Sequence, residues 1–155
     1  MLRAFWKMLR VGGWAPLLVL LIYTFLNRAL HAYLRWPWLD IPTHFSGGLA
    51  IGFLVSRCFQ GMPRQGAVRS RVVLLELVLV VTITATAAVF WEFAEFAVDQ
   101  VYGTNLQVSL ANTMRDLAMG MLGATVIALV RARQLSLSFG DLLEVTADWA
   151  RGPLA

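Results

Sequence analysis

The sequence contains few charged residues. Asp, Glu, Lys and Arg make up 14% of its 155 residues, and hydrophobic residues make up 59%. A soluble domain has about 25% charged and about 45–50% apolar residues. The composition therefore excludes a disordered tail and most soluble enzymes. It is typical of an integral membrane protein, and the length suffices for one domain with three or four helices of about 20 residues that each cross a bilayer.

Several chemical signatures are also missing from the sequence. The single cysteine, Cys58, excludes an intramolecular disulfide. There is no nucleophile motif, no glycine-rich phosphate loop and no arginine cluster of the kind that phosphatases use. The sequence therefore assigns no catalytic residue and no cofactor.

Four apolar segments are long enough to cross a membrane. A short stretch with two prolines and two tryptophans, residues 36–42, joins the first two and predicts an antiparallel hairpin. No small-residue cleavage site follows the basic start of the chain, so we expect the first segment to be retained. We predict an all-α, polytopic four-helix transmembrane bundle over residues 1–134, with helices at about residues 14–34, 42–59, 72–98 and 113–130.

Lys and Arg lie mostly beside the segment ends that would share one side of the membrane. With four crossings, ten of the 13 Lys and Arg residues fall on that side, and Arg28, Arg35 and Arg115 fall on the other. Cytoplasmic loops of membrane proteins are enriched in Lys and Arg, so we predict that both termini lie in the cytoplasm. The net charge of +4 then indicates membrane orientation and not nucleic-acid binding.

Residues 135–155 form a cytoplasmic tail in this interpretation. Asp141 and Glu144 have the spacing of a capping box at a helix N-terminus. Leu142, Val145 and Trp149 share one helical face. These residues predict a short C-terminal amphipathic helix over residues 137–150, which lies at the membrane interface or docks on a partner subunit.

Most acidic residues of the four segments gather at the helix ends opposite to the basic side. Asp40 and His44 are four residues apart, and Glu92 and Glu95 share one helical face with Asp99. Like charges near a bilayer are unfavourable unless a cation, an arginine or a shared proton neutralises them. We therefore expect a polar site on the periplasmic side, with the candidates Asp40, His44, Glu92, Glu95, Arg115 and Asp116.

Two chemistries fit these residue types. Imidazole and carboxylate ligands suit a zinc, manganese or iron ion, and the candidate ligands are His44, Glu92 and Asp116. The paired Glu-x-x-His motifs of di-iron bundles are absent. Carboxylates beside a histidine also suit acid–base chemistry on a lipid head group. For Glu95 and Asp99, the alternative is exposure to solvent in a periplasmic loop.

Small residues recur at a four-residue spacing in two segments. Gly48 and Gly52 form a GxxxG motif, and Gly120 and Ala124 repeat the spacing. Such faces let helix backbones approach closely. We expect these faces to pack the bundle, and the alternative is a homodimer or partner interface. Near the cytoplasmic end of the third segment we expect Glu76 to pair with one of the arginines Arg57 and Arg71.

The order of the polar motifs resembles a family of bacterial inner-membrane proteins. Three motifs follow one another within residues 38–130: Asp40-x-x-x-His44-Phe, Glu92-x-x-Glu95-Phe and Asn112-Thr113-x-x-Asp116-Leu. The pattern is similar to the uncharacterised family typified by YjdF and, more distantly, to the VanZ-like family associated with glycopeptide resistance. Asn112 stands where an aspartate is usual in that pattern. The resemblance implies a shared polar set at Asp40, His44, Glu92, Glu95, Thr113 and Asp116.

These observations favour a small integral inner-membrane protein whose periplasmic acidic and histidine site binds a cation or a lipid-linked polar group. Arg115 would contact an anionic group at that site. The alternative is an accessory subunit that packs against and stabilises a larger membrane complex. Its interface would be the small-residue faces and the acidic C-terminal helix. Membrane lipids are the expected partners in both cases, and no sequence feature identifies a substrate.

Overall fold

The protein consists of helices and short loops. The computed structural model describes residues 6–7, 9–60 and 67–134, and these residues contain no strand. The all-α prediction is therefore confirmed for them, whereas the helix predicted over residues 137–150 lies outside them. The elements in chain order are η1 (Leu9–Gly13), α2 (Trp14–Leu30), α3 (Ala32–Arg35), η2 (Pro37–Leu39), α4 (Asp40–Phe59), α5 (Ala67–Tyr102) and α6 (Leu110–Gln134).

Three helices in the described part of the chain are long and apolar enough to cross a membrane. They are Leu9–Leu30, Val73–Tyr102 and Leu110–Gln134. The 20 residues of α4 would extend over about 30 Å, the hydrocarbon thickness of a bilayer. However, polar residues and glycines such as Asp40, His44 and Gly48 lower the mean hydropathy of α4. Three candidate spans are thus shown, and the fourth crossing stays a prediction.

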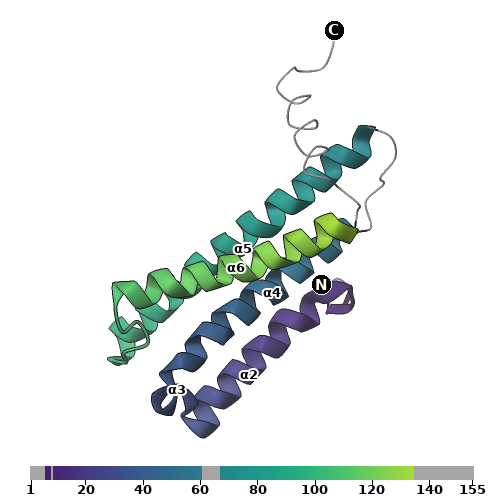
Figure 1. Cartoon of the computed structure of the whole chain (residues 1–155). Helices are drawn as coiled ribbons and strands as arrows, with labels where there is room; N and C mark the ends of the chain where they lie inside the picture. Colours follow the sequence, from purple (N-terminus) through teal and green to yellow (C-terminus); the bar gives the residue numbers. More distant parts are fainter. Residues whose placement is uncertain (1–5, 8, 61–66, 135–155) are drawn as a thin grey trace.

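Helix α4 lies at the centre of the bundle. Figure 1 shows it between α2 on one side and α5 and α6 on the other. Gly48, Gly52, Val55 and Phe59 of α4 are buried, whereas α2 has no buried residue. Because protein covers more of its surface, α4 can be less apolar than helices that face lipid.

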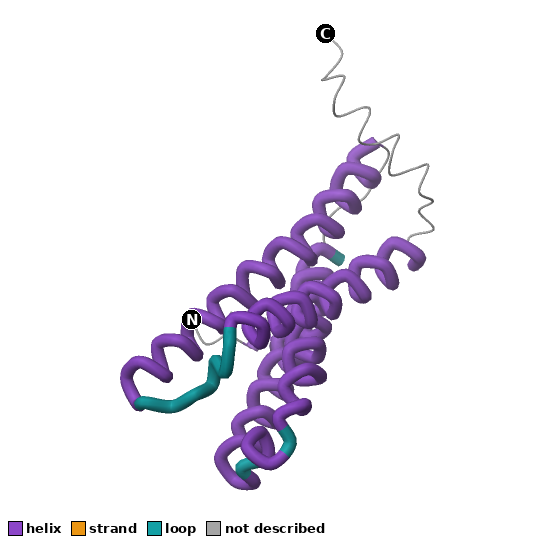
Figure 2. Tube along the Cα trace, turned by 60° about the vertical axis from the view of Figure 1, so that its left-hand side comes forward, coloured by secondary structure: helices purple, strands orange, loops and turns teal. Residues whose placement is uncertain are grey.

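The first predicted segment, residues 14–34, comprises α2 and most of α3. His31 separates the two helices because its backbone is left-handed, with φ 48° and ψ 37°. This conformation costs an L-residue roughly 1–2 kcal/mol, and the His31 N–H is satisfied by the Leu26 carbonyl. The break turns the chain so that α4 runs back along α2, and the loop of residues 103–109 similarly joins α5 to α6 (Figure 2).

The backbones of α4 and α6 are in direct contact. A Cβ atom added to Gly48 would collide with the Gly120 carbonyl, and one added to Gly123 would collide with the α4 backbone. A Cβ atom on Gly52 would lie 3.4 Å from the Ala124 Cα. The structure therefore places the small residues of both helices in one interface within the chain.

A buried carboxylate joins three helices at the end of the bundle away from the loop of residues 103–109. Glu76 of α5 has no exposed surface. It accepts hydrogen bonds from Ser56 Oγ of α4 at 2.7 Å and from Arg131 Nε of α6 at 2.8 Å. Arg57, one of the two partners expected from the sequence, donates to the Val11 carbonyl and to Gln60. Arg131 is a partner that the sequence does not predict.

Because glycines allow α4 and α6 to touch, alanine substitutions at Gly48 and at the neighbouring Gly47 should differ in their effect on stability. Gly48→Ala should lower the stability by about 1–3 kcal/mol, because the added methyl group forces the two backbones apart. A Cβ atom at Gly47 meets nothing within 4 Å, so Gly47→Ala should be neutral or stabilising by up to about 1 kcal/mol. Thermal unfolding followed by circular dichroism in detergent measures both. Equal unfolding midpoints would contradict the interface.

The buried carboxylate supports a second prediction. Arg131→Ala should destabilise the protein by about 3–5 kcal/mol, because it removes a partner from the buried Glu76 charge. The matched control is Arg133→Ala, since Arg133 is exposed on the same turn and such substitutions usually change stability by less than about 0.5 kcal/mol. Denaturant titration of the two variants compares them, and similar losses would show that the Glu76 contact does not hold the helices together.

Candidate functional site

Ionisable side chains from three helices converge at the end of the bundle that carries the loop of residues 103–109. Asp40 and His44 lie one turn apart at the start of α4, Glu92 and Glu95 near the end of α5, and Asp116 near the start of α6. Because α4 and α6 run antiparallel to α5, these three helix ends lie together (Figure 1). We call these five residues the carboxylate–histidine site.

His44 lies at the centre of the site. Its Nε2 is 3.4 Å from Asp40 Oδ1, and its Nδ1 is 3.9 Å from Glu92 Oε1. The potential ligand atoms of Asp40, His44 and Asp116 all lie within 4.8 Å of one another, and so do those of His44, Glu92 and Glu95. His44 therefore belongs to two groups that could each hold a metal ion.

One side of the site is a hydrogen-bonded network on α4 and α6. The Asn112 side-chain amide donates to Asp40 Oδ2 at 3.1 Å and also to Asp116 Oδ2. Arg115 donates to Asn112 Oδ1 at 2.7 Å and to Asp116 Oδ1 at 3.3 Å, and its guanidinium lies 3.5 Å from Asp40. One amide and one guanidinium thus hold two carboxylates together, and the Asp116 side chain is fully buried.

The other side of the site is less completely bonded. Gln107 Nε2 donates to Glu92 Oε2 at 3.0 Å, and Trp91 Nε1 donates to Glu95 Oε1 at 2.8 Å. Glu92 is only 4% exposed, yet its Oε1 has no hydrogen-bond partner in the described part of the chain. Since Oε1 faces His44 Nδ1 across 3.9 Å, an unsatisfied oxygen points into the centre of the site.

Asp99 shapes the loop that completes the site. Its carboxylate accepts hydrogen bonds from the Leu106 N–H at 2.8 Å, the Gln107 N–H at 2.9 Å and the Thr104 hydroxyl at 2.6 Å. These bonds place Gln107 where its side chain reaches Glu92. Asp99 therefore positions the loop, although its spacing from Glu92 also fits a single acidic face.

Six of the seven residues proposed from the sequence come together at this end of the bundle: Asp40, His44, Glu92, Glu95, Arg115 and Asp116. For the seventh, Thr113, the structure gives a hydrogen bond from its backbone N–H to the Ser109 carbonyl at 3.1 Å, in the first turn of α6. Asn112, Trp91 and Gln107 also bond to the site residues and are not among those predicted from the sequence. Helical spacing could have indicated Asn112 and Trp91, because they lie four residues before Asp116 and Glu95. It could not have indicated Gln107, which reaches the site only through the fold of the loop.

A tyrosine lies beside the start of α4. The Tyr33 hydroxyl is 2.6 Å from Thr43 Oγ1, which donates to the Leu39 carbonyl at 2.8 Å. A phenol is neutral at neutral pH, so Tyr33 adds no further negative charge near the carboxylates.

The network on α4 and α6 predicts a specific role for Asn112. Asn112→Ala should destabilise the protein by about 1–3 kcal/mol, because it removes the donor that Asp40 and Asp116 share. Asn105 is exposed in the loop of residues 103–109, so Asn105→Ala is the control and should leave stability nearly unchanged. Thermal midpoints in detergent measure the two variants. If both midpoints equal that of the wild-type protein, the amide does not bridge the carboxylates.

The comparison with known proteins gives a family without an assigned activity. Over residues 2–136 the chain matches the family described as "Predicted membrane protein (DUF2238)". This is the YjdF-like family that the motifs indicate, and the match shows no link to the VanZ-like family. No curated protein and no solved structure matches the chain. The chain therefore belongs to this DUF2238 family of predicted membrane proteins.

Proposed function

We propose that this protein crosses the bacterial inner membrane four times and binds a cation at the carboxylate–histidine site, on the periplasmic side. The cation is a metal ion or the ammonium group of a lipid, because both neutralise carboxylates. The observation that carries the proposal is the buried Glu92 Oε1, which lacks a hydrogen-bond partner in the described residues.

The geometry around Glu92 suits a cation. A buried acceptor without a partner costs roughly 1–3 kcal/mol, and most buried polar atoms in native proteins are satisfied. His44 Nδ1 lies 3.9 Å from Glu92 Oε1, which is too far for a hydrogen bond. Tetrahedral ligands at about 2.1 Å from zinc are about 3.4 Å apart. A movement of about half an ångström would bring the two atoms to that spacing.

The charge balance also favours a cation over an anion. The site contains the four carboxylates of Asp40, Glu92, Glu95 and Asp116, and in the described residues Arg115 is the arginine that pairs with them. Unbalanced charge near a bilayer is unfavourable, and a phosphate would add to the negative excess. Arg115 already pairs with the carboxylates of Asp40 and Asp116. In this proposal it therefore neutralises these carboxylates and does not bind an external anion.

The topology rests on α4 as the fourth crossing and on the distribution of Lys and Arg. Protein covers α4 on two sides, which supports a membrane-spanning helix of low mean hydropathy. Four crossings place ten of the 13 Lys and Arg residues on one side, and the positive-inside rule makes that side cytoplasmic. Both termini then lie in the cytoplasm, and the carboxylate–histidine site faces the periplasm.

The alternative, an accessory subunit of a larger complex, has no support in the described residues. The small-residue faces pack α4 against α6 within the chain. The acidic helix expected over residues 137–150 lies outside the described residues. We therefore propose the binding site as the function.

The test is zinc binding by the full-length protein in detergent, measured by equilibrium dialysis. We expect the wild-type protein to bind one Zn²⁺ per chain at the site. Glu92→Gln preserves the shape of the side chain but removes its charge, and should weaken binding by about 100-fold, since even residues that only support a metal ligand contribute about 10–100-fold. Gln100→Ala, at an exposed position of the same helix, should bind zinc as the wild type does.

Two results would contradict the proposed function. One is a wild-type protein that takes up no zinc. The other is a Glu92→Gln variant that binds zinc as tightly as the Gln100→Ala control.

A further inference from the structure

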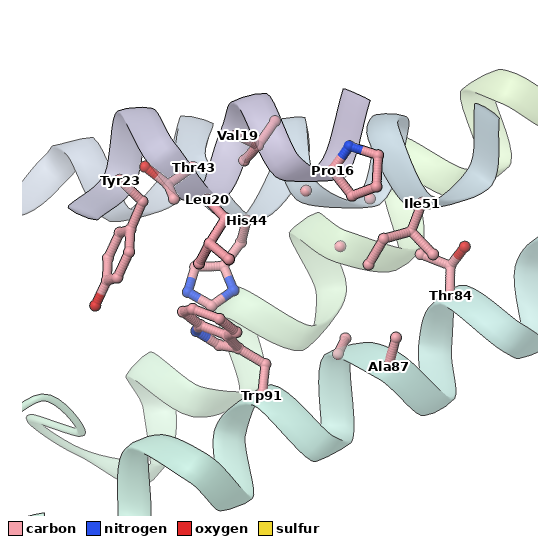
Figure 3. Close-up of a pocket in the computed structure, with 14 residues that line it drawn as sticks. Pro16, Val19, Leu20, Tyr23, Thr43, His44, Ile51, Thr84, Ala87 and Trp91 are labelled. Carbon is pink, nitrogen blue, oxygen red and sulfur yellow. The ribbon is translucent and has the colours of Figure 1, made fainter. Parts of the chain in front are cut away.

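A cleft of about 240 Å³ lies between α2 and α5 and ends at the carboxylate–histidine site (Figure 3). Its walls come from residues 16–23 of α2 and 84–91 of α5, and its floor comes mainly from residues 43–51 of α4. His44 lines one end of this α2–α5 cleft. The cleft and the site therefore share a side chain.

The α2–α5 cleft presents hydrocarbon surface along most of its length. Its two threonines, Thr43 and Thr84, donate their hydroxyl protons to carbonyls of their own helices at 2.8 and 2.7 Å. The Trp91 N–H is bonded to Glu95. These polar groups are already satisfied, so a ligand in the cleft meets mainly apolar side chains along its length, with the His44 imidazole and the Tyr23 phenol toward one end.

The dimensions of the cleft suit a single hydrocarbon chain. Each wall contributes about eight residues, which rise about 10 Å along the helix axis. An extended acyl or isoprenoid chain suits a narrow cleft of this length with a volume of about 240 Å³. In a membrane, hydrocarbon chains also surround α2 and α5.

The direction of the cleft matches that of a membrane lipid. The His44 end lies near the helix ends, whereas Ile51 and Thr84 lie about two turns further toward the middle of α4 and α5. A lipid chain that follows the helices would thus have its head group at the His44 end. Carboxylates in excess at that end attract an ammonium group and repel a purely anionic head group.

We propose that the α2–α5 cleft holds part of one hydrocarbon chain of a membrane lipid whose amine head group reaches the carboxylates beside His44. This inference rests on the proposed cation site and adds a lipid ammonium group as a ligand that competes with a metal ion for the same carboxylates. It requires no additional protein partner.

The test is native mass spectrometry of the full-length protein after incubation in detergent with one of two lipids. Dipalmitoylphosphatidylethanolamine carries an amine, and dipalmitoylphosphatidylglycerol has the same acyl chains but no amine. We expect one phosphatidylethanolamine to be retained per chain, about tenfold more strongly than phosphatidylglycerol, a modest difference in binding energy. Saturating Zn²⁺ should reduce this retention, because it occupies the same carboxylates.

A pair of variants tests the position of the chain. Ala87→Leu enlarges a side chain that lines the cleft and should lower the retention of phosphatidylethanolamine by about tenfold. Ala94→Leu makes the same change at an exposed position of α5 and should leave retention unchanged. Gly47→Leu is a second cleft-filling variant, because a Cβ atom there meets nothing within 4 Å. Circular dichroism checks that each variant is folded. The preference between the two lipids is measured on the wild-type protein, so it does not depend on whether a variant folds.

Each contrary outcome overturns a defined part of the account. Equal retention of the two lipids would show that the site does not recognise the amine head group. If the folded variants Ala87→Leu and Gly47→Leu retain phosphatidylethanolamine as strongly as Ala94→Leu does, the hydrocarbon chain does not lie in the cleft. Both results leave the cation site intact as long as zinc distinguishes Glu92→Gln from the wild type, whereas loss of that distinction removes the site and the lipid inference together.

Discussion

The close contact between the backbones of α4 and α6 is the constraint on which the rest of the structure depends. Gly48 and Gly123 allow it, because a Cβ atom on either would collide with the backbone of the other helix. One turn before Gly48, toward the loop end, His44 and Asp116 come within 4.8 Å of each other. A separation by the width of one side chain would take Asp40 of α4 out of reach of Asn112 of α6, the donor that it shares with Asp116. Packing in the centre of the bundle therefore sets the geometry of the charged groups at its end.

Two buried carboxylates of α5 show how the ends of the bundle differ. Glu76 accepts from Ser56 and Arg131, which come from the two neighbouring helices. This end is held by a partnered charge. Glu92 has one bonded oxygen and one buried oxygen without a hydrogen-bond partner in the described residues. Because the α2–α5 cleft leads to the His44 imidazole that faces this oxygen, the incomplete bonding and the open space occur at the same place.

The sequence predicts those parts of the fold and site that depend on local spacing. The helical class follows from the composition, and the pairs Asp40–His44 and Glu92–Glu95 follow from helical periodicity. Contacts set by tertiary structure could not be predicted, such as Glu76 with Arg131, which is 55 residues away along the chain. Gln107 reaches Glu92 only because Asp99 folds the loop. The α2–α5 cleft depends on how far apart two helices lie, and no spacing within one helix reports that distance.

The central claim is that His44 and Glu92 bind one cation between them. The most direct measurement is the zinc K-edge X-ray absorption spectrum of the zinc-loaded, full-length protein. The account predicts an imidazole nitrogen and carboxylate oxygens at about 2.0–2.2 Å from the metal. It also predicts that the imidazole contribution disappears in His44→Ala. A shell of water oxygens alone, or a sulfur ligand from Cys58 at about 2.3 Å, would contradict it.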